Sequence, residues 1–140
     1  MLKNKTGDCF EANFLAVFNM WNETKNKRLL KEIRLCHGIM TGAPGSKIEN
    51  QKGWHCWIET QDVVFDYSNG NAIVGRKEEV YYRILEQTIM KYTIVDAMKL
   101  CHKTGHYGEW HKIDEKLQKE IESTEEWQKV NAGGEIKLNN

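Results

Sequence analysis

The chain has no extreme of composition, and what it lacks excludes several classes of protein. Acidic and basic residues balance at 20 each, so no excess of positive charge indicates nucleic-acid binding. Proline occurs once, at Pro44, which gives little support to a rigid linker between two domains. The longest apolar-rich stretch, residues 9–21, contains Glu11 and is far too short to cross a bilayer. We therefore expect neither nucleic acid nor a membrane as a partner.

The N-terminal sequence MLKNKTGDCF has lysines but no apolar run after them, so we expect no signal peptide. Without one, the four cysteines are most simply reduced thiols in the cytoplasm. Their spacing contains no CxxC pair, which counts against a zinc site. The chain has 140 residues, the length of one ordinary domain. We expect that domain over residues 1–131, followed by a flexible tail over 132–140.

Hydrophobic periodicity predicts an α+β fold, in which an N-terminal helix packs on an antiparallel sheet and further helices follow. Asp8 and Glu11 form a capping box at the start of the first helix, and apolar residues recur at helical spacing up to Trp21. The other expected elements are strands over 33–40, 54–59, 63–67 and 88–93, helices over 77–87 and 94–104, and a helical stripe from Trp110 to Ile121 that a capping box at Ser123 and Glu126 extends.

Cys9 is the candidate nucleophile because of its place in the first predicted helix. With Asp8 as the N-cap, Cys9 is the first helical residue, and its sulfur lies near the unpaired N–H groups of the helix start. These donors and the helix dipole stabilise a thiolate, which is the attacking form of a thiol. The backbone N–H of Cys9 is placed to form half of an oxyanion hole. Taken alone, such a cysteine more often only packs in the core, so its role depends on a partner.

The segment GWHCWIETQDVVFDYSNG predicts a hairpin that supplies this partner. A two-residue turn at Thr60–Gln61 sets His55 opposite Asp66, where the two Cβ atoms lie about 5 Å apart. A turn one residue later sets His55 opposite Ser68 but keeps Asp66 on the same face, whereas a three-residue loop would separate them. In either two-residue register the Asp66 carboxylate accepts the imidazole N–H and leaves the other ring nitrogen for the thiol.

The order of these residues, a cysteine at a helix start and then histidine and aspartate on adjacent strands, resembles the transglutaminase-like branch of the papain-like superfamily. In that branch a His-x-Trp-x-Glu strand precedes the aspartate strand, and HCWIE and FDYSNG look like these two segments. The chain is also similar to small proteins of bacteriophage and bacterial genomes, in which a GDC start, an HAW(V/I)E strand, an aspartate strand ending in SNG and a GHYG turn recur. GHYG stands here at residues 105–108, and the resemblance covers about residues 7–110.

The resemblance implies a papain-like core in which Cys9 is the nucleophile, His55 is first the base and then the acid, and Asp66 orients the imidazole. It implies acyl transfer from an amide, ester or isopeptide bond to water or an amine, with no cofactor and no metal. The substrate would be a peptide, a protein or a small amide or ester in the cytoplasm, of the host if the chain is phage-encoded. Papain-type enzymes add an oxyanion side chain before the nucleophile; the nearest amide here, Asn4, leaves that role unassigned.

Two functions of other classes stay open. One is a protease-like fold without chemistry that binds a partner, such as a host protein. The other is a metal site, because cysteine and histidine are adjacent at residues 36–37, 55–56 and 101–102. Adjacent strand residues face opposite ways and no two ligands have finger-like spacing, so the metal site is the weaker interpretation. Cys56, in particular, is expected to point away from His55 and into the core.

Three further features have both a functional and an ordinary interpretation. The glycine-rich segment 42–53 precedes His55 along the chain and is a candidate substrate lid, with a surface loop as the alternative. His102 and His106 are candidate pocket residues, although a solvated helix position and the turn after Gly105 also account for them.

Overall fold

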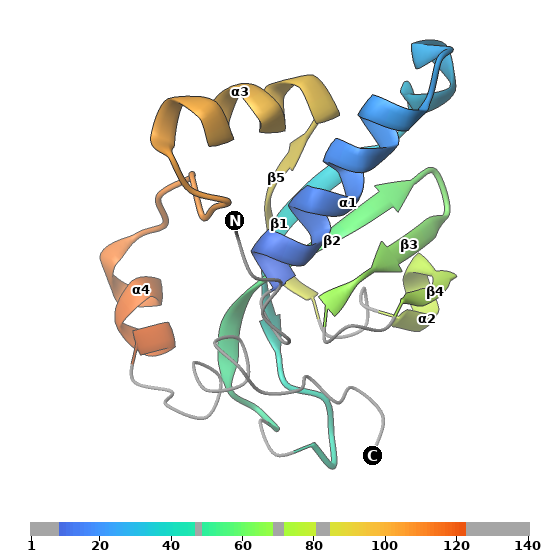
Figure 1. Cartoon of the computed structure of the whole chain (residues 1–140). Coiled ribbons are helices and arrows are strands. Elements are labelled where there is room, and N and C mark those ends of the chain that lie inside the picture. Colours follow the sequence, from blue (N-terminus) through green and yellow to red (C-terminus); the bar gives the residue numbers. More distant parts are fainter. Residues whose placement is uncertain (1–8, 47–48, 69–71, 81–84, 123–140) are drawn as a thin grey trace.

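The computed structural model describes residues 9–46, 49–68, 72–80 and 85–122. The fold is α+β, with an antiparallel sheet of five strands in the order β4-β3-β2-β1-β5 and an N-terminal helix on one of its faces (Figure 1). The elements in chain order are α1 (Cys9–Glu23), a short 3-10 helix η1 (Lys27–Leu30), β1 (Arg34–Thr41), β2 (Lys52–Thr60), β3 (Val63–Asp66), β4 (Ile73–Arg76), α2 (Lys77–Val80), β5 (Leu85–Tyr92), α3 (Ile94–Thr104) and α4 (Glu115–Glu122).

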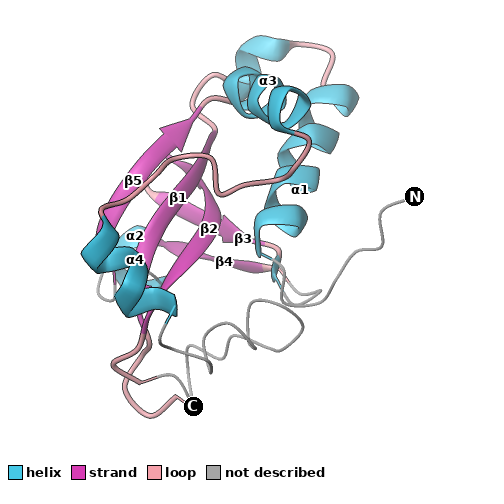
Figure 2. Ribbon diagram, turned by 90° about the vertical axis from the view of Figure 1, so that its left-hand side faces the viewer, coloured by secondary structure: helices cyan, strands magenta, loops and turns pink. Residues whose placement is uncertain are grey.

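Helices α1 and α3 lie side by side on one face of the sheet, and the main core lies beneath them (Figure 2). On α1, Phe14 and Val17 are buried as the helical stripe predicts, but Phe18 is 38% exposed. The reason is that the buried face of α1 is turned toward Asn13, which is fully buried. Apolar periodicity thus located the helix correctly but placed its buried face partly wrong.

The opposite face of the sheet has a smaller core cluster, made of Cys36, Met40, Trp57 and Val64. Val80 of α2 and the start of β5 at Leu85 pack against it. This packing explains why the helix predicted over 77–87 is wrong at residues 85–87, which belong to β5. Leu85 pairs with Met40 in the sheet and Gln87 pairs with Ile39, so pairing with β1 overrides the helix-favouring composition of the segment.

The helix predicted from Trp110 begins only at Glu115, where the Asp114 side chain accepts a 2.8 Å hydrogen bond from the Leu117 N–H. Residues 110–114 are not helical, because the Trp110 indole donates to the His106 carbonyl and packs over the sheet instead. The far end of the predicted stripe is confirmed: Ile121 packs in a cluster with two β-strand residues, Ile39 and Trp54.

The helix predicted over 94–104 is confirmed with both of its ends. The Thr93 hydroxyl accepts from the Asp96 N–H at the N-cap, and Gly105 has a left-handed conformation at the C-cap. His102 is exposed on this helix, and His106 lies exposed in the turn after it. The Asp8 N-cap, the capping box at Ser123 and Glu126, and the tail over 132–140 lie outside the described residues. No helix among the described residues is long and apolar enough to cross a membrane.

His37 is a fully buried histidine in the core between the sheet and the segment after α3. Its ring centroid lies 4.8 Å from that of Phe10, 5.0 Å from that of Tyr92 and 5.1 Å from that of Trp110. The backbone of Gly108 approaches so closely that a Cβ there would lie 2.7 Å from the imidazole Cε1. Neither ring nitrogen has a hydrogen-bond partner among the described residues. Burial therefore lowers the pKa of His37 to about 3 and keeps the ring neutral.

We expect this histidine to make the fold less stable in mild acid. The unfolded chain takes up a proton on His37 below the ordinary histidine pKa of 6.5, whereas the folded chain resists protonation down to a pKa of about 3, so stability is lost as the pH falls through this window. Between about pH 7 and about pH 5 the loss from this residue should be about 2 kcal/mol. Urea unfolding of the natural protein and of His37→Leu at both pH values measures it, and equal losses in the two proteins would contradict the expectation.

Candidate active site

Cys9 is the first residue of α1, as the sequence predicts, and its side chain is fully buried. The Cys9 carbonyl accepts a 2.9 Å hydrogen bond from the side-chain amide of Asn13, one turn further along the helix. The thiol therefore sits in the first turn of α1, beneath which the core is packed.

The hairpin of β2 and β3 has the later of the two predicted turns, at Gln61–Asp62. Thr60 pairs with Val63, and the register continues to Ile58 and Phe65, where the β2–β3 ladder ends. Beyond this point the two strands no longer exchange ladder bonds, and α1 meets them there. The predicted turn at Thr60–Gln61, which sets His55 directly opposite Asp66, is therefore wrong. The alternative turn one residue later, which keeps Asp66 on the same face as His55, is the one adopted.

His55 and Asp66 are in direct contact despite this offset register. The imidazole Nε2 lies 2.8 Å from the carboxylate Oδ2, and both side chains are about 1% exposed. The other carboxylate oxygen, Oδ1, accepts from the Asn13 amide at 3.0 Å, from the Ser68 N–H at 2.9 Å and from the Ser68 hydroxyl. Burial alone would raise the pKa of Asp66, but the charge of His55 and the hydrogen bonds that the carboxylate accepts lower it well below its usual range.

His55 also interacts with Cys9, so it contacts both other predicted residues of the site. Burial lowers the pKa of His55, but the charges of Cys9 and Asp66 and hydrogen bonds to both side chains outweigh it and raise the pKa to about 10. The imidazole is therefore protonated at neutral pH and lies between two groups that favour its charge. The structure thus brings Cys9, His55 and Asp66 together from α1, β2 and the end of β3.

Asn13 joins these three elements and was missed by the reasoning from sequence. Besides its bonds to Cys9 and Asp66, its amide donates to the Cys56 carbonyl at 2.9 Å and its carbonyl accepts from the Tyr67 N–H at 2.9 Å. One carboxamide thus hydrogen-bonds to the backbone of both segments, at the point where the β2–β3 ladder has ended. The sequence does contain a sign of this role, because Asn13 is a polar residue within an otherwise apolar helical stripe, one turn after Cys9.

Cys56 points into the core beneath α1, whereas Trp57 beside it belongs to the cluster on the opposite face, as strand alternation predicts. None of the four cysteines forms a disulfide bond, and only Cys101 is not buried. Within the described ranges, no group of three histidine, cysteine or acidic side chains is placed to hold a metal ion.

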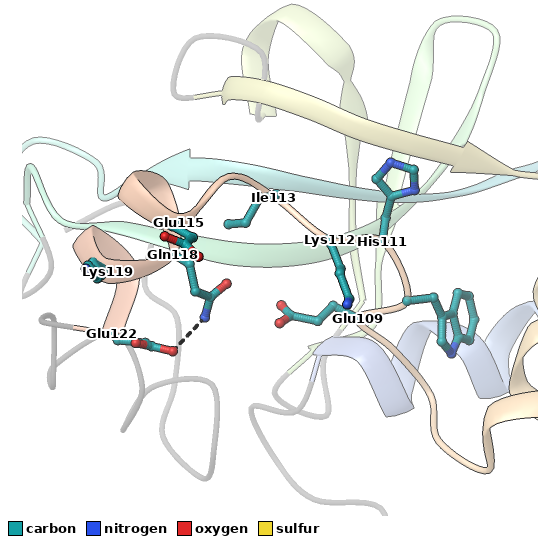
Figure 3. Close-up of a pocket in the computed structure, with 9 residues that line it drawn as sticks. Glu109, His111, Lys112, Ile113, Glu115, Gln118, Lys119 and Glu122 are labelled. Atoms are coloured by element: carbon teal, nitrogen blue, oxygen red, sulfur yellow. Dashed lines mark hydrogen bonds between the residues drawn. The ribbon is translucent and has the colours of Figure 1, made fainter.

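A cavity of about 590 Å³ lies between α4 and the segment that precedes it (Figure 3). Partial burial raises the pKa of Glu109 in its wall to about 7, and the charge of Glu122 adds to this effect. None of the three predicted site residues lines the cavity. Its lining residues are Glu109, Trp110, His111, Lys112, Ile113, Glu115, Gln118, Lys119 and Glu122.

Comparison with known proteins adds no relative, because no family model, no curated protein and no solved structure matches the chain. The resemblance to transglutaminase-like enzymes therefore stays a prediction, which depends on the motifs quoted above.

We expect Asn13→Ala to destabilise the fold strongly, because it leaves a buried carboxylate, a buried carbonyl and a backbone N–H each short of a partner. The loss should be roughly 2–4 kcal/mol in the free energy of unfolding. The matched control is Asn19→Ala, an exposed asparagine on the same helix, which should cost less than about 1 kcal/mol. Urea unfolding at neutral pH measures both, and similar losses in the two variants would show that the buried amide does not join the helix to the strands.

Proposed function

We propose that this protein is a cysteine-dependent acyl-transfer enzyme with a papain-like, transglutaminase-like core. The observation that carries the proposal is the contact of one buried imidazole with a helix-start thiol and with a carboxylate at 2.8 Å. Cys9 is then the nucleophile, His55 the proton carrier and Asp66 the group that orients the imidazole. This is the arrangement that activates a thiol for attack on a carbonyl carbon.

In the proposed reaction the Cys9 thiolate attacks the carbonyl carbon of an amide, ester or isopeptide bond, and the carbonyl oxygen becomes an oxyanion. The backbone N–H of Cys9 at the helix start is one candidate donor to that oxyanion. Protonated His55 gives its proton to the leaving amine or alcohol as the tetrahedral intermediate collapses to a thioester. Neutral His55 then removes a proton from water or an amine, which attacks the thioester and regenerates the thiolate.

Asp66 keeps the imidazole in one orientation throughout this cycle. Its Oδ2 holds the Nε2 side of His55, which leaves the other ring nitrogen for the thiol and the substrate. Because the carboxylate accepts three further hydrogen bonds at Oδ1, it stays ionised while the imidazole changes charge. We propose a peptide, a protein or a small amide or ester as the substrate, and the cytoplasm as the place of action.

A second candidate is a module that binds a partner protein and carries out no chemistry. The observation that favours it is the burial of the site: Cys9 is fully buried and His55 is 1% exposed. A substrate reaches the sulfur only after neighbouring parts of the chain have moved, whereas a binding module needs no such opening. Covalent labelling of Cys9 distinguishes the two candidates.

We expect p-nitrophenyl acetate to acetylate Cys9, with a burst of nitrophenol as the thioester forms. His55→Ala should slow the burst by at least about a hundredfold, because the proton carrier is lost, and Cys9→Ser should abolish it. Peptide mass spectrometry locates the acetyl group, and hydroxylamine should remove it, since thioesters react readily with this amine.

The matched controls are Cys101→Ser and His102→Ala on α3, a partly exposed thiol and an exposed imidazole outside the site. Both should leave the burst unchanged. Acetylation of Cys101 in place of Cys9, or a burst that survives His55→Ala, would overturn the enzyme and leave the binding module as the better account.

A further inference from the structure

The strand that carries His55 has two more polar or aromatic side chains on the same face, and the proposed reaction uses neither of them. His55, Trp57 and Glu59 alternate along β2 and are all buried. The rings of His55 and Trp57 are nearly parallel, with an angle of 14° between their planes and 6.2 Å between their centroids. The indole is therefore the next side chain along the face on which the imidazole lies.

Trp57 is held at both ends of its indole. At one end Nε1 donates a 2.8 Å hydrogen bond to Glu59 Oε2. At the other end the six-membered ring lies on the backbone of Gly38, where a Cβ would be 2.7 Å from Trp57 Cη2 and 2.8 Å from the Gln87 carbonyl oxygen. Gly38 is the residue of β1 that pairs directly with His55. The absent side chain at this position lets the indole lie flat on the sheet next to the imidazole.

Glu59 is in turn held by cations from two other elements. It is 2% exposed, and its Oε1 lies 3.2 Å from the Lys77 ammonium of α2 and 2.9 Å from the Lys91 ammonium of β5. A buried carboxylate without such partners would be costly, so the two lysines explain why it is tolerated here. The position of the indole is therefore tied to the sheet, to β5 and to α2.

We propose that Trp57 is a positioning residue for His55, and that Glu59 with its two lysines holds Trp57 in place. Asp66 accepts the hydrogen bond of the imidazole at Nε2, and Cys9 also interacts with the ring. Hydrogen bonds made in the plane of a ring resist a tilt of the ring out of that plane only weakly. The neighbouring indole blocks this movement on one side and keeps the other ring nitrogen directed at Cys9. It also excludes water from that side, which strengthens the charge interactions of His55 with both partners.

The consequence for catalysis depends on the proposed function, but the position of the ring does not. The charges that act on the pKa of His55 are those of Cys9 and Asp66, and both act only while the ring stays between them. The titration of His55 therefore reports its position even in a protein that catalyses nothing.

The test is Trp57→Phe, which removes the indole N–H and one ring without changing any charge. Imidazole NMR resonances follow the titration of His55, and circular dichroism checks the fold. In the natural protein the midpoint should lie near the pKa of about 10, and in Trp57→Phe it should fall by about one pH unit or more. Acetylation of Cys9 by p-nitrophenyl acetate should slow by about tenfold in the same variant.

Trp54→Phe is the matched control, because it is the same substitution on the same strand, at a position that alternates to the opposite face. It should leave the His55 midpoint unchanged. A folded Trp57→Phe protein with the midpoint of the natural protein, or an equal shift in Trp54→Phe, would overturn the proposal.

If Trp57→Phe does not fold, Gly38→Ala decides by the same criterion, because its Cβ would lie 2.7 Å from Trp57 Cη2 and so shifts the indole without changing any charge. A natural protein that takes no acetyl group on Cys9 would remove the proposed enzyme. A His55 midpoint lowered by Trp57→Phe in that protein would still support the positioning role, so the two failures are distinguishable.

Discussion

The buried carboxylate of Asp66 imposes the strongest physical constraint on this fold. An ion removed from water costs several kcal/mol unless hydrogen bonds and an opposite charge replace its hydration. The replacements come from three parts of the chain: the imidazole of His55 on β2, the amide of Asn13 on α1, and Ser68 just after β3. The observed packing of the helix on the hairpin is the position in which these three parts of the chain satisfy the charge together. That position also puts the start of α1, and with it Cys9, beside the imidazole.

The surroundings of each buried histidine determine its ionisation. Two histidines are almost fully buried on adjacent strands, yet burial lowers the pKa of His37 to about 3 while the pKa of His55 rises to about 10. His37 is surrounded by aromatic rings, and no charge among the described residues offsets its desolvation. His55 lies between Asp66 and Cys9, whose charges exceed the desolvation cost. A neutral structural histidine and a protonated histidine in a candidate site thus differ only in what surrounds them.

Burial keeps water away from the candidate site and also keeps its side chains from the surface. Charges interact more strongly away from water, which strengthens the attraction between the imidazolium of His55 and the carboxylate of Asp66. Parts of the sheet on both faces contribute to this environment: the core beneath α1 contains Cys9 and Cys56, and the opposite face contains Trp57. The pairing of β2 with β3 ends at Ile58 and Phe65. Beyond this point Asn13 of α1 hydrogen-bonds to the backbone of both segments, at Cys56 and at Tyr67.

Local patterns in the sequence account for several of the helices and strands of this protein and for some of their ends. The start of α1 at Cys9, the caps of α3 and the β2–β3 hairpin follow from side chains within a few residues of each feature, and such local interactions can be read along the chain. Only the tertiary structure decided which hairpin register was adopted, that residues 85–87 join β5 rather than a helix, and that Asn13 links the nucleophile helix to the aspartate strand. Each of these depends on what is buried against residues far away in the sequence, and burial of an apolar surface or a charge outweighs the small local preferences that a sequence displays.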